Sequence, residues 1–223
     1  MNTEVFIKRI SAWAPGITGS DEWKEWALGN KEITAGTKGP DLSFADPMFR
    51  RRLSLISKMT IQAAHDLMPL DNTKIFFYSF RGEISRQFNV NKMLIEENML
   101  SPASFSLSVF NAPVALATMA LGLKGGYSAI YPGYNSFSTS LLTAQAAILG
   151  GTAEEIAFIY ADEEVPSEYC SFFNGNVPVA ISFGLLLSKT PDEKCVGLKL
   201  PDEQDNPLSF LKKTLLGGMN VSP

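Results

Sequence analysis

Residues 121–151 read LGLKGGYSAIYPGYNSFSTSLLTAQAAILGG and predict a strand, a tight turn and a helix in succession. The apolar run at 127–131 is typical of a short strand, and the Pro-Gly-Tyr-Asn sequence at 132–135 is typical of a turn. Residues 136–149 predict a helix that ends at two glycines. Because this helix has no charged residue and small side chains surround its leucines, we expect it to lie in the middle of the protein.

Tyr134 and Asn135 are in the predicted turn between this strand and the helix. The N-terminus of a helix is electropositive and can stabilise an anion or a thiolate, so the two residues are candidates for a functional site. The same pattern is also typical of an ordinary core element in an α/β protein. The residue pattern alone leaves both interpretations open.

Strands and helices alternate along the rest of the sequence. Strand patterns occur at residues 4–12, 74–80, 127–131, 154–160 and 178–188. Helix patterns occur at residues 21–29, 47–68, 83–98, 104–123, 136–149 and 208–216. In the second of these, apolar residues recur every three or four positions from Leu53 to Leu67. This alternation predicts an α/β sheet with helices on both faces.

The composition of the chain narrows the classes of protein to which it can belong. The chain has 223 residues, of which 45% are hydrophobic and 19% charged, so it can bury a sizeable core. Its net charge of −4 argues against a general nucleic-acid binder, and the one basic run, at residues 50–52, is expected to open a helix on a solvated face. No apolar stretch reaches the roughly 18 residues of a membrane span without a charge or a Gly/Pro break.

The two cysteines and the single histidine exclude several further kinds of functional site. Cys170 and Cys195 are too far apart for a CxxC motif and too few for a disulfide scaffold, which favours a reducing, cytoplasmic compartment. The charged N-terminal run is not expected to be a signal peptide. With His65 as its one histidine, the chain cannot form a His-rich metal site, and we expect neither a metal nor a cofactor.

Several segments resemble the β-ketoacyl synthases, which have the thiolase fold. Residues 121–151 resemble the nucleophile segment of that family. The matching positions there and upstream keep the family's register without gaps; they are Ser101, Pro102, Asn111, Leu123, Lys124, Gly125, Ala144, Ile148 and Gly151. Residues 77–82 resemble the loop after the second core strand, and residues 5–16 resemble the first strand.

The resemblance implies half of a thiolase-like fold, an α/β domain whose five predicted strands form one mixed sheet with helices on both faces. We expect one β-ketoacyl synthase N-terminal-like domain over residues 1–223, with its core at about 4–190. The position of the nucleophilic cysteine holds Tyr134, and a phenol with a pKa near 10 cannot replace a thiolate. The catalytic histidines belong to the family's C-terminal half, which is expected to be absent. Alone, the chain is expected to be a pseudoenzyme with no catalytic residue.

An inactive ketosynthase-like chain resembles the chain length factors, which pair with an active ketosynthase and share an acyl tunnel at the interface. Residues 111–123 and 134–142 look most like the subfamily found with aryl polyene biosynthesis. The expected partner is a full-length β-ketoacyl-ACP synthase, in a heterodimer or a higher assembly, and through it an acyl carrier protein in polyketide or fatty-acid-like elongation. The strand at 127–131 is expected at a sheet edge and, as in the family, to pair across the dimer.

The family's register also names candidate tunnel and interface residues. Arg81 holds the position of a gating residue, and Ser104 and Phe105 hold positions that reach across the dimer. The full set is Arg81, Ser104, Phe105, Ser108, Phe110, Ala112, Tyr134 and Asn135, and a plain packing role stays open for each. Two alternative functions also stay open: a scaffold that binds a carrier protein without length control, and an acyl hydrolase or transferase. The latter would need a histidine partner for Ser136 or Ser138.

Overall fold

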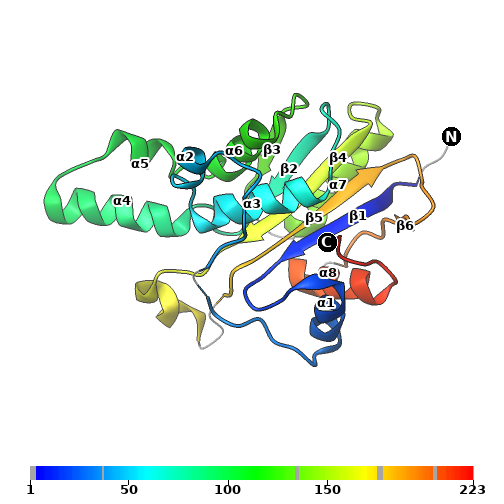
Figure 1. The fold of residues 1–223 in the computed structure, drawn as a ribbon, viewed down its shortest axis with the longest axis horizontal. Coiled ribbons are helices and arrows are strands. Elements are labelled where there is room, and N and C mark those ends of the chain that lie inside the picture. Colours follow the sequence, from blue (N-terminus) through cyan, green and yellow to red (C-terminus); the bar gives the residue numbers. More distant parts are fainter. Residues whose placement is uncertain (1–3, 37, 134–135, 175–177, 203–204, 223) are drawn as a thin grey trace.

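One mixed sheet of six strands organises the chain in this computed structural model (Figure 1). The structure describes residues 4–36, 38–133, 136–174, 178–202 and 205–222. The strand order is β3 (Tyr127–Ile130), β2 (Lys74–Tyr78), β4 (Glu155–Asp162), β5 (Ile181–Ser188), β1 (Phe6–Trp13) and β6 (Val196–Gly197). Strand β2 runs parallel to β3 and β4, and the pairs β4–β5, β5–β1 and β1–β6 are antiparallel.

The prediction of a mixed sheet is confirmed, but the predicted number of five strands is wrong. The sixth strand, β6, is only two residues long and pairs with Phe6 and Ile7 of β1. A pair of residues carries no alternation of apolar and polar side chains, so the sequence gives no signal for it. The prediction that residues 127–131 form an edge strand is confirmed, because β3 ends the sheet.

Helices cover both faces of the sheet, as predicted. They are α1 (Gly19–Leu28), α2 (Pro47–Arg50), α3 (Leu55–Asp66), α4 (Ile84–Glu97), α5 (Pro102–Ser106), α6 (Ala112–Leu121), α7 (Ser136–Leu149) and α8 (Pro207–Leu216), with a 3-10 helix, η1, at Ser167–Phe173. Helices α1, α7 and α8 share one core with the sheet, and α3 and α6 share the other. The continuous apolar sequence of β2 follows from this, because alternate side chains enter opposite cores.

Two predicted helices are each divided in two. The pattern at 47–68 forms α2 and α3, because the hydroxyl of Ser54 accepts a hydrogen bond from the backbone N–H of Ser57 and starts a new helix. Arg50 is the last residue of α2 and Arg51 caps its C-terminus, so residues 50–52 end a helix and do not open one. The pattern at 104–123 forms α5 and α6, with Ser101 capping α5 and Pro113 in the first turn of α6.

Helix α7 is buried on one side only. Phe137, Leu141 and Ile148 enter the core, whereas Leu142 and Leu149 on the other side are 50% and 40% exposed. The expectation that this helix lies in the middle of the protein is therefore wrong for the described chain. Its uncharged outer side has no cover there, although its composition is typical of a buried helix.

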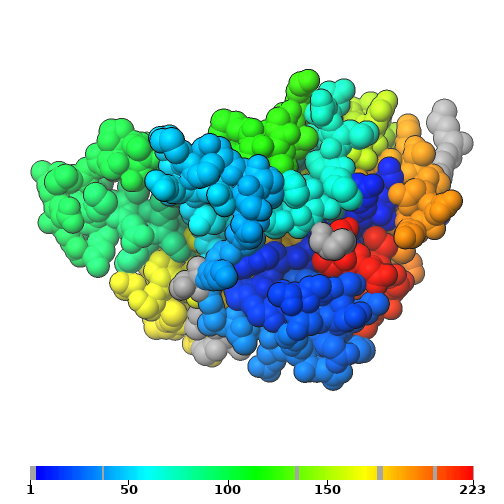
Figure 2. Space-filling view, in the orientation of Figure 1, coloured from blue at the N-terminus to red at the C-terminus, as the bar shows by residue number. Residues whose placement is uncertain are grey.

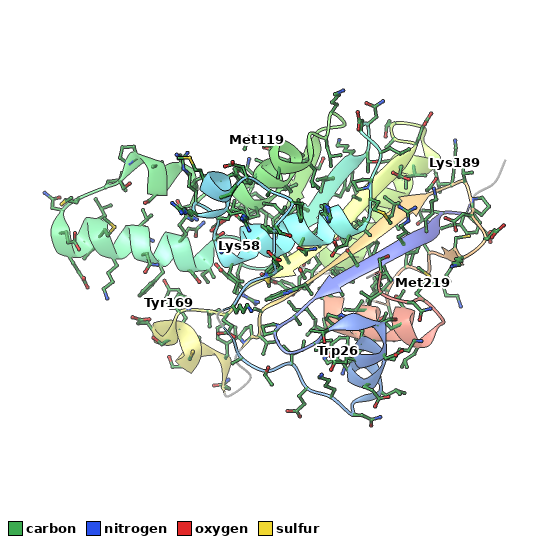
Figure 3. All side chains as sticks on the ribbon, viewed as in Figure 1. Trp26, Lys58, Met119, Tyr169, Lys189 and Met219 are labelled. Carbon is green, nitrogen blue, oxygen red and sulfur yellow. The ribbon has the colours of Figure 1, made fainter. Side chains whose placement is uncertain are left out.

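Helices α4 and α5 form an arm that extends away from the sheet (Figures 1 and 2). Val90 is the one described residue of α4 that is buried. Near the base of the arm, Tyr169 of η1 packs edge-on against Phe88 of α4, with ring centroids 5.4 Å apart (Figure 3). The arm is therefore held at its base, and most of its length faces solvent.

Candidate functional site

The loop that follows β2 is anchored by Asp162 at the end of the neighbouring strand β4. Parallel strands end at the same edge of a sheet, which brings these two segments together. The fully buried carboxylate of Asp162 accepts hydrogen bonds from the hydroxyls of Ser79 (2.8 Å) and Tyr160 (2.9 Å) and from the backbone N–H groups of Phe80 and Arg81 (both 3.1 Å). Burial and the charge of Asp162 raise the pKa of Tyr160 well above 10, so its hydroxyl stays a donor.

Arg81 extends from this loop beside the same carboxylate. Its Nη2 lies 3.5 Å from Oδ2 of Asp162, and its side chain is 16% exposed. Its Nε is buried and has no hydrogen-bond partner among the described residues. The guanidinium is thus electrostatically paired, while part of its donor capacity is unused.

A cavity of about 570 Å³ lies between this loop, the arm, the segment that leads into α6 and the end of β3. Four aromatic residues line it: Phe80, Phe105, Phe110 and Tyr131. The rings of the last two stack with centroids 4.0 Å apart. Gly82 permits this packing, since its φ is +55° and a Cβ atom there would lie 2.7 Å from the Phe110 ring.

Four of the residues named from the sequence line this one cavity: Arg81, Phe105, Ser108 and Phe110. The backbone carbonyl of Ser108 accepts a hydrogen bond of 2.9 Å from Gln87 of α4, which ties the arm to the cavity wall.

The other named residues lie elsewhere. Ser104 is in α5, with its N–H bonded to Ser101, and Ala112 is buried at the start of α6; neither lines the cavity. Tyr134 and Asn135 lie outside the described residues.

Sequence reasoning missed Phe80, Tyr131 and Asp162. The first directly precedes the candidate Arg81, and the second ends the predicted edge strand. Asp162 could have been found from the rule that polar residues at the carboxyl ends of adjacent parallel strands meet.

A second cluster of buried carboxylates sits at the base of the arm. Glu83 is fully buried and accepts hydrogen bonds from the hydroxyls of Ser54 (2.6 Å) and Ser57 (2.7 Å) of the α3 N-terminus, while Arg86 Nε lies 3.3 Å away. Glu163, which is 3% exposed, accepts a hydrogen bond from the N–H of Ser85. Burial, and next the charge of Glu83, raise the pKa of Glu163 to about 7.

The surroundings of Ser136 and Ser138 do not support a hydrolytic centre. The hydroxyl of Ser136 lies 2.7 Å from that of Tyr78, and the hydroxyl of Ser138 donates to the carbonyl of Pro201. His65 is in α3, which packs on the opposite face of the sheet from α7, and it stacks on Phe44. Neither serine therefore has a histidine partner among the described residues.

The described residues contain no group of three or more His, Cys, Asp or Glu side chains placed to hold a metal ion. None of the helices in the described ranges has the length and apolar character needed to cross a membrane.

The family model for the β-ketoacyl synthase N-terminal domain matches residues 23–214, which is most of the chain. The chain belongs to this family. The predicted resemblance is thereby confirmed, and with it the thiolase-like fold class. A comparison with the curated proteins found no match.

Solved ketosynthase structures share the fold. The chain is similar to a chain of "Ketosynthase (ApeO) in Complex with its Chain Length Factor (ApeC)" from Xenorhabdus doucetiae, with a TM-score of 0.77 and 24% identity, covering 96% of this chain and 92% of that one. For the ishigamide ketosynthase/chain length factor the TM-score is 0.68, with 14% identity over 83% of this chain and 62% of that one. For the ketosynthase from module 1 of the bacillaene synthase of Bacillus amyloliquefaciens FZB42 the TM-score is 0.60, with 16% identity over 84% of this chain and 42% of that one. The chain thus spans nearly all of the first of these chains and less than two thirds of the other two.

Proposed function

We propose that this chain is a non-catalytic ketosynthase-like subunit, a chain length factor, that pairs with an active β-ketoacyl-ACP synthase and shapes the acyl tunnel. The observation that carries the proposal is the aromatic cavity, where Arg81, Phe105, Ser108 and Phe110 come together from three segments of the chain. Two of the similar solved structures are named as ketosynthase and chain length factor together, which supports the same role here.

The absence of catalysis follows from the residue types. Tyr134 stands where the family has its nucleophilic cysteine, and a phenol is protonated and weakly nucleophilic at neutral pH. His65 is the one histidine in the sequence, and its helix packs on the face of the sheet opposite α7, the helix that follows Tyr134. The chain therefore needs an active ketosynthase to take part in condensation, with the acyl carrier protein reaching the tunnel through that partner.

Two surfaces suit such a partner. Strand β3 is an edge of the sheet, and edge strands tend to be covered or paired by another chain. The arm, with the link between its two helices, exposes a set of large apolar side chains: Leu94, Ile95, Met99, Leu100 and Phe105. Apolar groups gathered on one projecting element are typical of a protein interface.

Co-expression with a full-length ketosynthase tests the proposal. We expect a 1:1 heterodimer by native mass spectrometry, no condensation by this chain alone, and products whose length depends on its presence. Ile95→Asp, at a position that is 81% exposed on the arm, should weaken the complex; the matched control Leu28→Asp, 59% exposed on α1, should not. Condensation by the isolated chain, or a ketosynthase whose product lengths are the same with and without it, would refute the proposal.

A further inference from the structure

The arm is attached to the rest of the protein mainly through the first half of α4. Val90 is the one described residue of this helix that is buried. The amide of Gln87 donates a hydrogen bond to the carbonyl of Ser108, and the ring of Phe88 packs edge-on against Tyr169 (Figure 3). Segments with few buried apolar contacts open locally at a lower free energy than the core. The arm is therefore a segment that can open while the sheet stays folded.

Two buried carboxyl groups lie at this attachment, one on each side of it. Glu83, at the N-cap of α4, is fully buried and accepts hydrogen bonds from the hydroxyls of Ser54 and Ser57 at the start of α3. Glu163, directly after β4, is 3% exposed and accepts a hydrogen bond of 3.2 Å from the backbone N–H of Ser85, in the first turn of α4. Because Ser85 is two residues from Glu83, docking of α4 brings the two carboxyl groups together.

The cations around this pair balance only one of the two carboxyl groups. Nε of Arg86 lies 3.3 Å from the carboxylate of Glu83, and its Nη2 donates to the carbonyl of Arg52. Among the described residues, no cation lies within ion-pair distance of Glu163. A cavity of about 720 Å³ gives water a route to Glu163, and α3 lines it with the uncharged Ser54 and Leu55. Its other charged lining residues come from α4, from the segment after β4 and from η1: Arg86, Lys92, Glu164 and Glu168.

The protonation of these carboxyl groups is linked to the docking of α4. Burial, and next the charge of Glu83, raise the pKa of Glu163 to about 7, and burial also raises the pKa of Glu83. Both causes act on Glu163 only while α4 is docked, since opening the arm admits water and moves Glu83 away. A carboxyl group whose pKa is higher in the closed state binds its proton more tightly there. Protonation therefore favours the closed state, and ionisation favours the open one.

We propose that Glu83 and Glu163 form a proton-operated clasp, which holds the arm against α3 and the end of β4 while Glu163 is protonated and releases it when Glu163 is ionised. Ionisation places a second negative charge beside Glu83 with no further cation to balance it, and opening of the arm relieves the repulsion. The clasp sets how firmly the arm presents its exposed apolar side chains, among them Ile95 and Phe105. It lies wholly within this chain and does not depend on the proposed function.

Hydrogen–deuterium exchange of the full-length chain tests the clasp, read by mass spectrometry of its peptides at pH 5, 6, 7 and 8 and corrected for the intrinsic pH dependence of amide exchange. The protection of α4 should be lower than that of β4 at every pH, because the arm opens on its own. It should also fall about tenfold between pH 6 and pH 8, as follows from a pKa of 4.5 in the open state and about 7 in the closed state.

Three variants separate the clasp from a general effect of pH. Glu163→Gln should remove the tenfold loss of protection in α4. Glu83→Gln, which removes the neighbouring negative charge, should give a smaller loss than the wild type. The matched control Glu154→Gln, at an exposed position just before β4, should behave as the wild type.

Three results would overturn the proposal. The first is a protection of α4 in the wild type that does not change between pH 6 and pH 8. The second is a loss in Glu163→Gln as large as in the wild type. The third is equal protection of α4 and β4 at every pH, which would mean that the arm opens only when the whole protein unfolds.

Discussion

Replacing Glu163 by glutamine tests how one buried carboxyl at the base of the arm affects the stability of the protein. The pKa of this carboxyl rises from its ordinary value of 4.5 to about 7, first through burial and second through the charge of Glu83. Each pKa unit corresponds to about 1.4 kcal/mol, so the rise amounts to about 3 kcal/mol. Between pH 4.5 and 7 the folded protein holds this proton and the unfolded chain has released it. The free energy of unfolding therefore falls by about 3 kcal/mol as the pH rises through this window, and this group causes no further change above it.

Glutamine stays neutral at every pH and has nearly the same shape, so the stability of Glu163→Gln should not fall as the pH rises through this window. Urea unfolding followed by circular dichroism at pH 5, 6, 7 and 8 measures the free energy of unfolding of both proteins. We expect similar stability of variant and wild type at pH 5 and a gain for the variant that approaches about 3 kcal/mol at pH 8. Glu154→Gln, at an exposed position just before β4, is the matched control and should follow the wild type. Parallel curves for Glu163→Gln and the wild type from pH 5 to pH 8 would refute the assignment of a raised pKa.

Three further predictions concern the cavity and the arm. Phe105→Ala should lengthen the products of the heterodimer, read by mass spectrometry of carrier-bound chains, at a modest cost in stability because the ring is 54% exposed; an unchanged length distribution in an intact complex would leave only a scaffolding role. Gly82→Ala should lower the free energy of unfolding by roughly 2 kcal/mol more than the control Gly122→Ala. Both glycines have a positive φ, but only a Cβ atom at position 82 would press against Phe110. Equal losses of stability in urea unfolding would contradict this packing. Ile95→Asp should raise the Kd for the ketosynthase at least about tenfold in calorimetry while leaving the Tm of the isolated chain unchanged, and equal affinity would exclude the outer arm from the interface.

Much of the sheet could be predicted from the sequence because its strands have distinctive patterns. The apolar run of β2 and the strand-turn-helix segment around β3 and α7 are long enough to be recognised. Strand β6 is too short to show any period. The break between α2 and α3 was missed for another reason. The apolar stripe from Leu53 to Leu67 already begins inside the break, and the side chain of Ser54 decides where α3 begins.

Part of the cavity could be anticipated, because the register of a known family singled out Arg81, Phe105, Ser108 and Phe110, and all four line this cavity. Their role as tunnel or interface residues stays a prediction. Asp162 could not be recognised from that register, and finding it requires the rule that polar residues at the carboxyl ends of adjacent parallel strands meet. The raised pKa of Glu163 was equally hidden. It depends first on burial and next on the charge of Glu83, which is 80 positions away in the sequence but close to Glu163 at the junction of α3, α4 and β4.

The end of β4 connects the two buried clusters. Successive side chains of a strand point to opposite faces, and the residues of β4 follow this rule: Phe158 and Tyr160 enter one core, and Ile159 and Ala161 enter the other. Asp162 continues the first series and anchors the loop that carries Arg81, whereas Glu163, the next residue, reaches the base of the arm between α3 and α4. One strand end thus holds both the loop that carries the cation of the cavity and the first turn of α4, where the arm begins.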